Sequence, residues 1–197
     1  MPAAPITHLL YLHGFRSSPQ STKSRKVAAW TREHHPEVTW WCPQLPPSPA
    51  AAMKLLADGT AGWPAASMGV MGSSLGGFYA TCIAERMGCR AVLLNPAVFP
   101  ARDLAKHIGE HTSWHDPGER FFFESGYVDE LHAMETAAIT RPERYFAVIA
   151  KGDEVLDWRE MTGRNHGAHI KLLEGGDHAL SGFDNDLPET LAFLGLS

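Results

Sequence analysis

The chain has 197 residues, of which 44% are hydrophobic and 20% are charged, and this balance is typical of one globular domain, which we place at 1–197. The formal net charge is -5 at pH 7, and no basic run offsets it, which argues against a nucleic-acid partner. No apolar run is long enough to cross a bilayer, and the first residues lack the pattern of a signal peptide. We therefore expect a cytoplasmic protein with neither a nucleic-acid nor a membrane partner.

Cysteine and histidine spacing gives no sign of a metal site. The three cysteines, Cys42, Cys82 and Cys89, form no Cys-x-x-Cys pair, and we expect them to be reduced and mostly buried. The eleven histidines include no His-Glu-x-x-His motif. The sequence therefore predicts no metal and no cofactor.

The first half of the chain alternates apolar runs with amphipathic segments. We predict strands over 7–12, 38–41 and up to about 71, and helices over 23–34, from 48 or 49 to 56, and 78–87. The segment 43–49 is rich in proline and is predicted to be irregular, because proline removes a backbone donor and fixes φ.

The second half continues this alternation but contains a longer connection. We predict strands over 90–94, 145–150 and 169–173, and helices over 157–166 and 187–194. The segment 97–140 is longer than an ordinary crossover and is predicted to be a helical insertion that ends in a crossover helix over 128–139. Continuously apolar strands that alternate with helices predict a doubly wound parallel α/β sheet of about six strands, with helices on both faces.

A glycine-rich turn lies between the third predicted strand and the next helix. It contains Gly72-x-Ser74-x-Gly76, the pattern of a nucleophile elbow, in which a sharp turn exposes a strained serine. Gly72 and Gly76 are expected where a Cβ atom would collide with the neighbouring strand or helix. Ser73 is the rival nucleophile, but it precedes the serine of the pattern by one position and would point elsewhere.

Reactive residues follow several of the predicted strands. In an open parallel sheet the carboxyl ends of the strands share one edge, where ligands bind. Ser74, Asp153 and His178 all come just after strands, in the chain order Ser, Asp, His. A histidine can activate a serine hydroxyl, and a carboxylate fixes the imidazole tautomer, so we predict a catalytic triad. Asp157, and less strongly Asp129, compete with Asp153 for the role of the acid.

The loop after the first strand and the insertion supply the other predicted site residues. The backbone N–H groups of Phe15 and Leu75 are the expected donors to the negative charge that develops on a substrate carbonyl oxygen. His13, in the same loop as Phe15, is assigned to substrate binding. The aromatic residues Phe121, Phe122 and Phe123 are interpreted as a wall of the substrate pocket, although such a run is more often core packing.

Several stretches together resemble the small bacterial esterases of the YqiA/YcfP type, a branch of the α/β-hydrolase superfamily. They are Tyr11-Leu12-His13-Gly14-Phe15-x-Ser17-Ser18-Pro19, Glu33-His34-His35-Pro36, Pro43-Gln44-Leu45-Pro46-Pro47, the elbow itself, Asn95-Pro96-Ala97-Val98, Gly152-Asp153-Glu154-Val155-Leu156-Asp157 and Gly176-Asp177-His178. The resemblance implies a carboxylic-ester hydrolase that uses Ser74, an acid in the 152–157 loop, and His178. It also implies a trimmed α/β-hydrolase sheet, because the chain has no room before Thr7 for the superfamily's first strands.

These observations favour a serine esterase that acts on a small acyl ester without a cofactor. Hydrolysis of a thioester such as an acyl-CoA would use the same groups. A hydrolase-fold binding protein without catalysis is the alternative from a different class, and it is disfavoured because such proteins usually lose the serine or the histidine.

Overall fold

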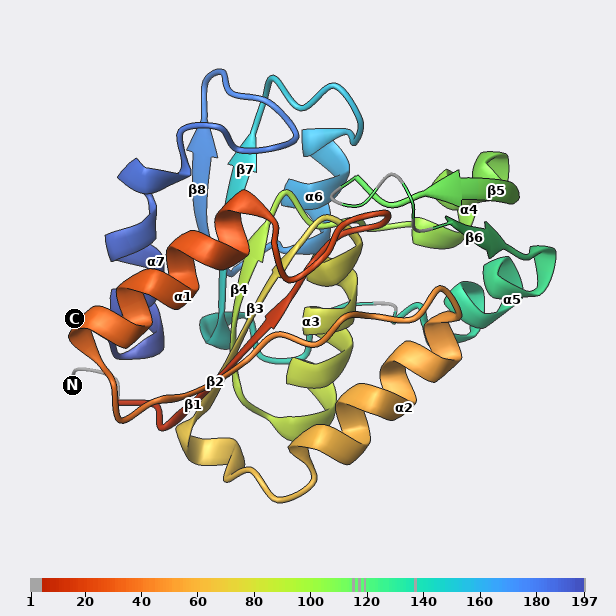
Figure 1. The fold of residues 1–197 in the computed structure, drawn as a ribbon. Helices are drawn as coiled ribbons and strands as arrows, with labels where there is room; N and C mark the ends of the chain where they lie inside the picture. The colour runs from red at the N-terminus through yellow and green to blue at the C-terminus, as the bar shows by residue number, and fades with distance from the viewer. Residues whose placement is uncertain (1–4, 115, 117, 119, 137, 197) are drawn as a thin grey trace.

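Six parallel strands form the central sheet of the computed structural model, which describes residues 5–114, 116, 118, 120–136 and 138–196. Their order is β2 (Thr39–Trp41), β1 (His8–Leu12), β3 (Met68–Ser73), β4 (Arg90–Leu94), β7 (Tyr145–Ala150) and β8 (His169–Leu173) (Figure 1). The chain runs outward from β1 to β2 and then returns to the other side of β1 for β3. This reversal places a topological switch point between β1 and β3, which is where ligands bind in such sheets.

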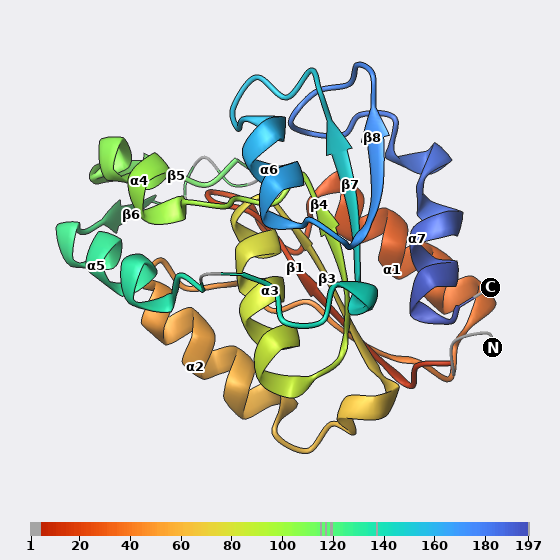
Figure 2. The same ribbon diagram turned by 180° about the vertical axis from the view of Figure 1, so that it is seen from behind.

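Helices cover both faces of the sheet, as predicted. Figures 1 and 2 show α1 (Thr22–His34) and α7 (Leu187–Leu194) on one face, and α2 (Pro49–Thr60), α3 (Leu75–Met87) and α6 (Trp158–Arg164) on the other. Alternate side chains of β1 separate accordingly: Leu9 and Tyr11 pack under α1 and α7, whereas Leu10 and Leu12 pack toward α2 and α3. The two resulting apolar clusters bury the sheet from both sides.

Local chemistry sets the helix boundaries. The side chains of Ser21, Ser48 and Asp157 accept N-terminal backbone N–H groups of α1, α2 and α6. Gly88 and Gly195 end α3 and α7 in the left-handed conformation, with φ values of 78° and 89°. The helix predicted to end at 56 runs on to Thr60, and the helix predicted from 78 starts at Leu75.

The insertion between β4 and β7 differs from its prediction as a helical segment. It contains α4 (Pro100–Leu104), a 3-10 turn (Ala105–His107) and the antiparallel hairpin of β5 (Gly109–Thr112) and β6 (Arg120–Phe123), followed by α5 (Ser125–Met134). The crossover helix thus spans 125–134 and not 128–139. Positions 115, 117, 119 and 137 of the insertion, and the ends 1–4 and 197 of the predicted domain, lie outside the described residues. Further 3-10 turns cover Ala65–Ser67, Pro142–Arg144 and Phe183–Asn185.

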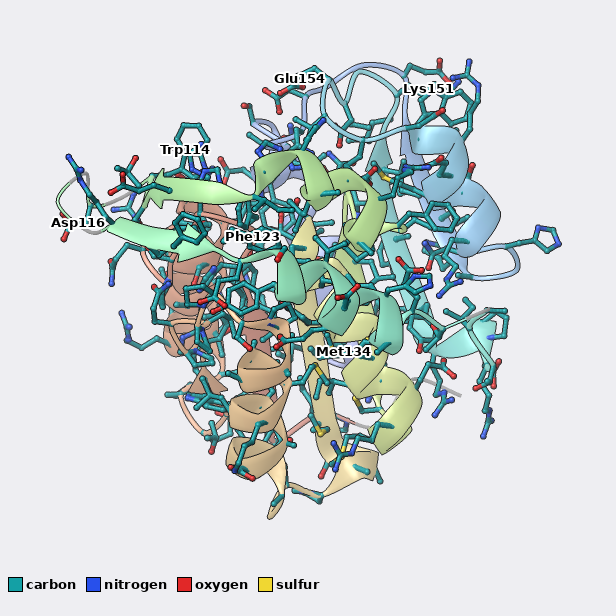
Figure 3. All side chains as sticks on the ribbon, turned by 90° about the vertical axis from the view of Figure 1, so that its right-hand side faces the viewer. Trp114, Asp116, Phe123, Met134, Lys151 and Glu154 are labelled. Carbon is teal, nitrogen blue, oxygen red and sulfur yellow. The ribbon has the colours of Figure 1, made fainter. Side chains whose placement is uncertain are left out.

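Aromatic contacts attach the hairpin to the loop that follows β1. The Phe15 ring packs edge-on against His111, Phe121 and Phe123, with centroid distances of 5.3, 5.8 and 5.4 Å. Figure 3 shows the hairpin side by side with α4 and α5, with Trp114 toward one end of it. The helices described do not include one that is both long and apolar enough to cross a membrane.

Candidate active site

Ser74 occupies a sharp turn between β3 and α3. Its φ and ψ angles are 57° and -122°, a conformation that costs a non-glycine residue about 1–3 kcal/mol. A Cβ atom on Gly72 would lie 2.1 Å from the Gly76 carbonyl oxygen, and one on Gly76 would lie 2.0 Å from that of Leu12. Strand, turn and helix therefore approach too closely for any side chain at these glycines, which agrees with the expected geometry.

Backbone hydrogen bonds hold the strained turn in place. The Ser74 N–H donates to the Leu94 carbonyl on the neighbouring strand at 3.0 Å. The Ser74 carbonyl accepts from the N–H groups of Gly77, Phe78 and Ala97. Because the surrounding elements fix both peptide groups, the Ser74 side chain is presented at the carboxyl edge of the sheet.

Ser74, His178 and Asp153 are joined by hydrogen bonds. His178 Nε2 lies 3.0 Å from Ser74 Oγ, and His178 Nδ1 lies 2.8 Å from Asp153 Oδ2. The Asp153 side chain is fully buried, and its other oxygen accepts the N–H groups of Val155 and Leu156, both at 2.8 Å. A carboxylate held in this way requires the proton on Nδ1, which leaves Nε2 free to accept the serine proton.

The rival residues lie elsewhere. Asp157 caps α6 by accepting the Arg159 N–H at 2.9 Å. Asp129 is exposed on α5, and Ser73 is buried as the last residue of β3. Lys151, one residue before the Gly152-Asp153 turn, bonds to Glu174 at 2.6 Å, and its ammonium lies 5.4 Å from the Trp158 ring.

Asn95 and Glu154, neither of which was assigned a role from the sequence, hold the His178 loop. The Asn95 amide donates to the carbonyls of Asp177 and His178 at 3.0 and 3.3 Å, and its oxygen accepts the Ala150 N–H at 2.8 Å. Glu154 accepts the His178 N–H at 2.9 Å. Both residues come shortly after strands, and this position in the sequence was the signal that could have identified them as part of the site.

The two backbone N–H groups predicted to meet an oxyanion, those of Phe15 and Leu75, come from two separate segments. Leu75 opens α3 and Phe15 follows Gly14 in the loop after β1. Among the described residues neither N–H has a hydrogen-bond acceptor. A Cβ atom on Gly14 would lie 3.2 Å from that of Ser74, so the glycine allows this loop to approach the serine closely.

His13 is nearly buried, with 4% of its surface exposed. Its Nε2 accepts the Leu45 N–H at 3.1 Å, so the proton is on Nδ1, which lies 3.0 Å from the Gly14 carbonyl oxygen. The imidazole thus ties the loop after β1 to the proline-rich segment after β2. His13 also lines two cavities near Ser74, although both of its ring nitrogens lie against backbone groups of the protein.

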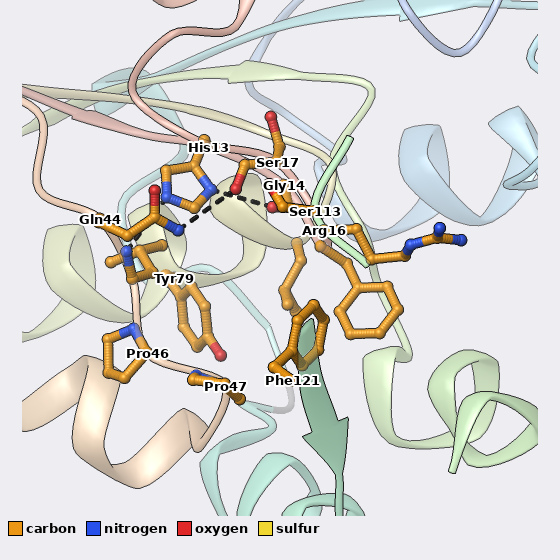
Figure 4. A pocket seen from close by; sticks show the side chains of 13 residues that line it. His13, Gly14, Arg16, Ser17, Gln44, Pro46, Pro47, Tyr79, Ser113 and Phe121 are labelled. Atoms are coloured by element: carbon orange, nitrogen blue, oxygen red, sulfur yellow. Dashed lines mark hydrogen bonds between the residues drawn. The ribbon is translucent and has the colours of Figure 1, made fainter. Parts of the chain in front are cut away.

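A cavity of about 320 Å³ is lined by Phe15 and Leu75, among other residues. Figure 4 shows Pro46, Pro47, Tyr79 and Phe121 around it. The strand geometry of β6 separates the three predicted wall residues: Phe121 lines the cavity, Phe122 is 57% exposed, and Phe123 is buried in the core beneath. Only Phe121 of the three therefore reaches this space.

The described part of the chain contains no cluster of three or more His, Cys, Asp or Glu side chains able to hold a metal ion. Burial raises the pKa of the Cys82 thiol and that of the Cys89 thiol to about 11, so both stay protonated near neutral pH.

Solved structures of other proteins share the fold across nearly the whole chain. Est1E from Butyrivibrio proteoclasticus with bound ferulic acid superposes with a TM-score of 0.71 at 13% identity, covering 96% of this chain and 88% of its own. The metagenome-derived lipolytic enzymes LipS and LipT give 0.70 at 16% identity, with 99% and 96% covered. Mouse alpha/beta hydrolase domain-containing protein 10 gives 0.67 at 13% identity, with 96% and 92% covered.

At such low identities the likeness concerns the fold, which is that of the α/β-hydrolases. Similarity in sequence is shown by a family model that matches residues 8–195. It agrees with the resemblance to the YqiA type. The chain belongs to the uncharacterised protein family UPF0227 and has a six-stranded α/β-hydrolase fold.

Proposed function

We propose that this chain is a serine esterase that cleaves small carboxylic esters through an acyl-enzyme. Ser74 is the nucleophile, His178 the general base and acid, and Asp153 the residue that orients the imidazole. The observation that carries the proposal is the hydrogen-bonded series from Ser74 Oγ through His178 to the buried Asp153. It starts from a serine in the strained conformation of a nucleophile elbow.

In the first half-reaction His178 Nε2 takes the Ser74 proton as Oγ attacks the ester carbonyl carbon. The carbonyl oxygen becomes negative and accepts the N–H groups of Phe15 and Leu75, which have no acceptor among the described residues. Such donors are worth about 2.7–4 kcal/mol each in comparable sites. The tetrahedral intermediate then collapses, and His178 protonates the departing alcohol while the acyl group stays on Ser74.

The second half-reaction repeats these roles with water. His178 Nε2 removes a proton from a water molecule, whose oxygen attacks the acyl carbon. The second tetrahedral intermediate uses the same two donors, and its collapse returns the proton to Ser74 and releases the carboxylic acid. Asp153 stays ionised throughout and stabilises the imidazolium formed in each step.

The cavity lined by Phe15 and Leu75 would receive the acyl group. Apolar side chains border it, including Leu45, Leu75 and Phe121, and its volume of about 320 Å³ is at the small end of ligand sites. Est1E, which has this fold, binds ferulic acid, a small aromatic acid. The whole chain, with its insertion as the wall of the acyl site, would act as a single catalytic domain.

Two other functions use the same scaffold. A thioesterase would need the same triad and cavity, so it differs only in the leaving group. A binding protein without catalysis would have no need for a serine held in a strained turn at 3.0 Å from a histidine. The complete set of groups is the reason to favour catalysis.

The test is hydrolysis of p-nitrophenyl acetate by the parent and two serine variants. Ser74→Ala should lose about 10⁴- to 10⁶-fold in rate while remaining folded. Ser73→Ala, one residue away, should retain most of the activity. Hydrolysis by folded Ser74→Ala at near the parent rate would contradict the proposal.

A further inference from the structure

A second cavity, of about 220 Å³, is also lined by Gly14 and Phe15 of the loop after β1. Its lining includes Ser74 and His178 themselves. Its lining also includes Lys23 and the hydroxyl-bearing residues Tyr11, Ser17 and Ser21. The acyl cavity has polar lining residues of its own, among them Arg16, Ser17 and Ser113, but Lys23 does not line it. We propose that this cavity binds the leaving group of the ester and that Lys23 selects leaving groups that carry a carboxylate. This inference rests on the proposed esterase function.

Lys23 reaches the site from the first turn of α1. Its ammonium donates a hydrogen bond to the carbonyl of Ala179, the residue that follows His178. That is its one hydrogen bond within the described part of the chain, and an ammonium has three donors. Two donors are therefore left for a ligand in the cavity.

Charge around the ammonium is poorly compensated. The carboxylates of Asp153 and Asp177 lie near enough to attract it, yet burial has the larger effect and lowers the pKa of Lys23 to about 8. Both carboxylates are already held by other donors: Asp153 by His178 and two N–H groups, and Asp177 by the Ser181 N–H and hydroxyl. A partly desolvated cation with unused donors favours an incoming anion.

Tyr11 adds an unused buried donor to the same cavity. Its side chain is fully buried, and its hydroxyl has no hydrogen-bond partner among the described residues, although Ser21 lies beside it. Burial raises the pKa of this phenol, so it remains a neutral donor. A ligand oxygen that accepts hydrogen bonds from both Lys23 and Tyr11 would satisfy the Tyr11 hydroxyl, a buried polar group that is costly to leave unpaired.

The position of His178 assigns the cavity to the leaving group. The imidazole must hand its proton to the departing oxygen, which therefore lies on the side of His178. His178 lines this cavity and is absent from the lining of the acyl cavity, which instead contains Leu75, Tyr79 and Phe121. Phe15 lines both cavities, so an ester with its acyl part in one and its alcohol part in the other would carry its carbonyl group near this residue.

The test compares two esters with the same acyl group and similar leaving groups, 4-acetoxybenzoate and 4-acetoxybenzamide. The first carries a carboxylate and the second a neutral amide at the same place. The parent should prefer 4-acetoxybenzoate in kcat/KM by on the order of tenfold, the usual gain from a charge-assisted hydrogen bond. Lys23→Met should lose this preference, and Lys23→Arg should keep part of it.

Lys26→Met is the matched control. Lys26 lies one turn further along α1 and pairs with Asp184 at 2.5 Å, and it is not part of the cavity lining. This variant should keep the parent preference, and Lys23→Gln replaces Lys23→Met if the latter does not fold. A parent that hydrolyses both esters equally, or a preference that survives in Lys23→Met, would overturn the leaving-group site alone. Failure to hydrolyse either ester would overturn the proposed esterase function together with it.

Discussion

His178 Nε2 lies 3.0 Å from Ser74 Oγ although 104 positions separate the two residues in the chain. Ser74 follows β3 and His178 follows β8, and two strands, β4 and β7, lie between them in the sheet. The loop after β8 must therefore cross the ends of both strands to reach the serine. Asn95, directly after β4, is one of the side chains that hold this loop, through the carbonyls of Asp177 and His178.

Asp153 and Asp157 should respond to substitution in opposite ways. Asp153→Asn removes the charge that fixes the Nδ1–H tautomer of His178, so kcat should fall about 10²- to 10⁴-fold. Asp157→Ala removes the cap of α6, worth about 1 kcal/mol, and should lower Tm by a few degrees with most of the activity kept. Steady-state kinetics and thermal unfolding of both variants check this. The reverse pattern would move the role of the acid to Asp157.

Asn95→Asp should reduce catalysis more than stability explains. The substitution keeps an acceptor for the Ala150 N–H but removes the donors to the Asp177 and His178 carbonyls and sets a charge against them. We expect kcat to fall by about tenfold or more, with KM nearly unchanged, because His178 loses its alignment.

Asn165→Asp provides a control of the same chemistry. Asn165 is also buried, and its amide donates to the Met161 carbonyl at 2.9 Å, away from the triad. This variant should melt earlier than the parent and keep its kcat. Equal losses of kcat in both variants at equal stability would count against Asn95 as a positioning residue.

The three phenylalanines near the end of the hairpin should give three different results. Phe121→Ala enlarges the acyl cavity and should shift preference toward longer p-nitrophenyl esters. Phe122→Ala, on the exposed side of the same strand, should leave the chain-length profile unchanged. Phe123→Ala removes a buried ring and should destabilise the fold by about 3–5 kcal/mol. Chain-length profiles and unfolding curves distinguish these outcomes, and an unchanged profile in Phe121→Ala would exclude it from the acyl site.

The preference for a carboxylate-bearing ester should depend on pH. Lys23 is cationic below its pKa of about 8 and loses its charge as the pH rises above it. The carboxylates of Asp153 and Asp177 attract it and the Ala179 carbonyl accepts its hydrogen bond. The other titratable residues of the cavity are Tyr11 and His178. The kcat/KM ratio of 4-acetoxybenzoate to 4-acetoxybenzamide should therefore fall between about pH 7 and about pH 9. Any effect of pH on the shared catalytic steps is common to both esters and cancels in the ratio, and a constant ratio would contradict this prediction.

Much of the sheet could be predicted because local sequence patterns mark its strands. Apolar runs mark each central strand, and β4 and α7 have the predicted bounds. The elbow and the residues that follow β7 and β8 could be placed at one edge because parallel strands end together. The structure brings three of these residues together, with His178 within hydrogen-bond distance of both Ser74 and Asp153.

The hairpin and the role of His13 could not be predicted in this way. Phe122 is apolar yet exposed, so β6 reads as a continuous apolar run and its alternation is hidden. His13 contacts the Leu45 N–H, 32 positions away, and no local spacing encodes that contact. Lys23 sits in an amphipathic helix, where a lysine ordinarily signals a solvated face.

The most direct test of the account is the site of covalent labelling by a fluorophosphonate probe, read by peptide mass spectrometry. Such a probe reacts with a serine only when a neighbouring base activates it. The parent and Ser73→Ala should be labelled at Ser74, and Ser74→Ala should not be labelled. A folded parent protein that remains unlabelled, or one labelled at another residue, would contradict it.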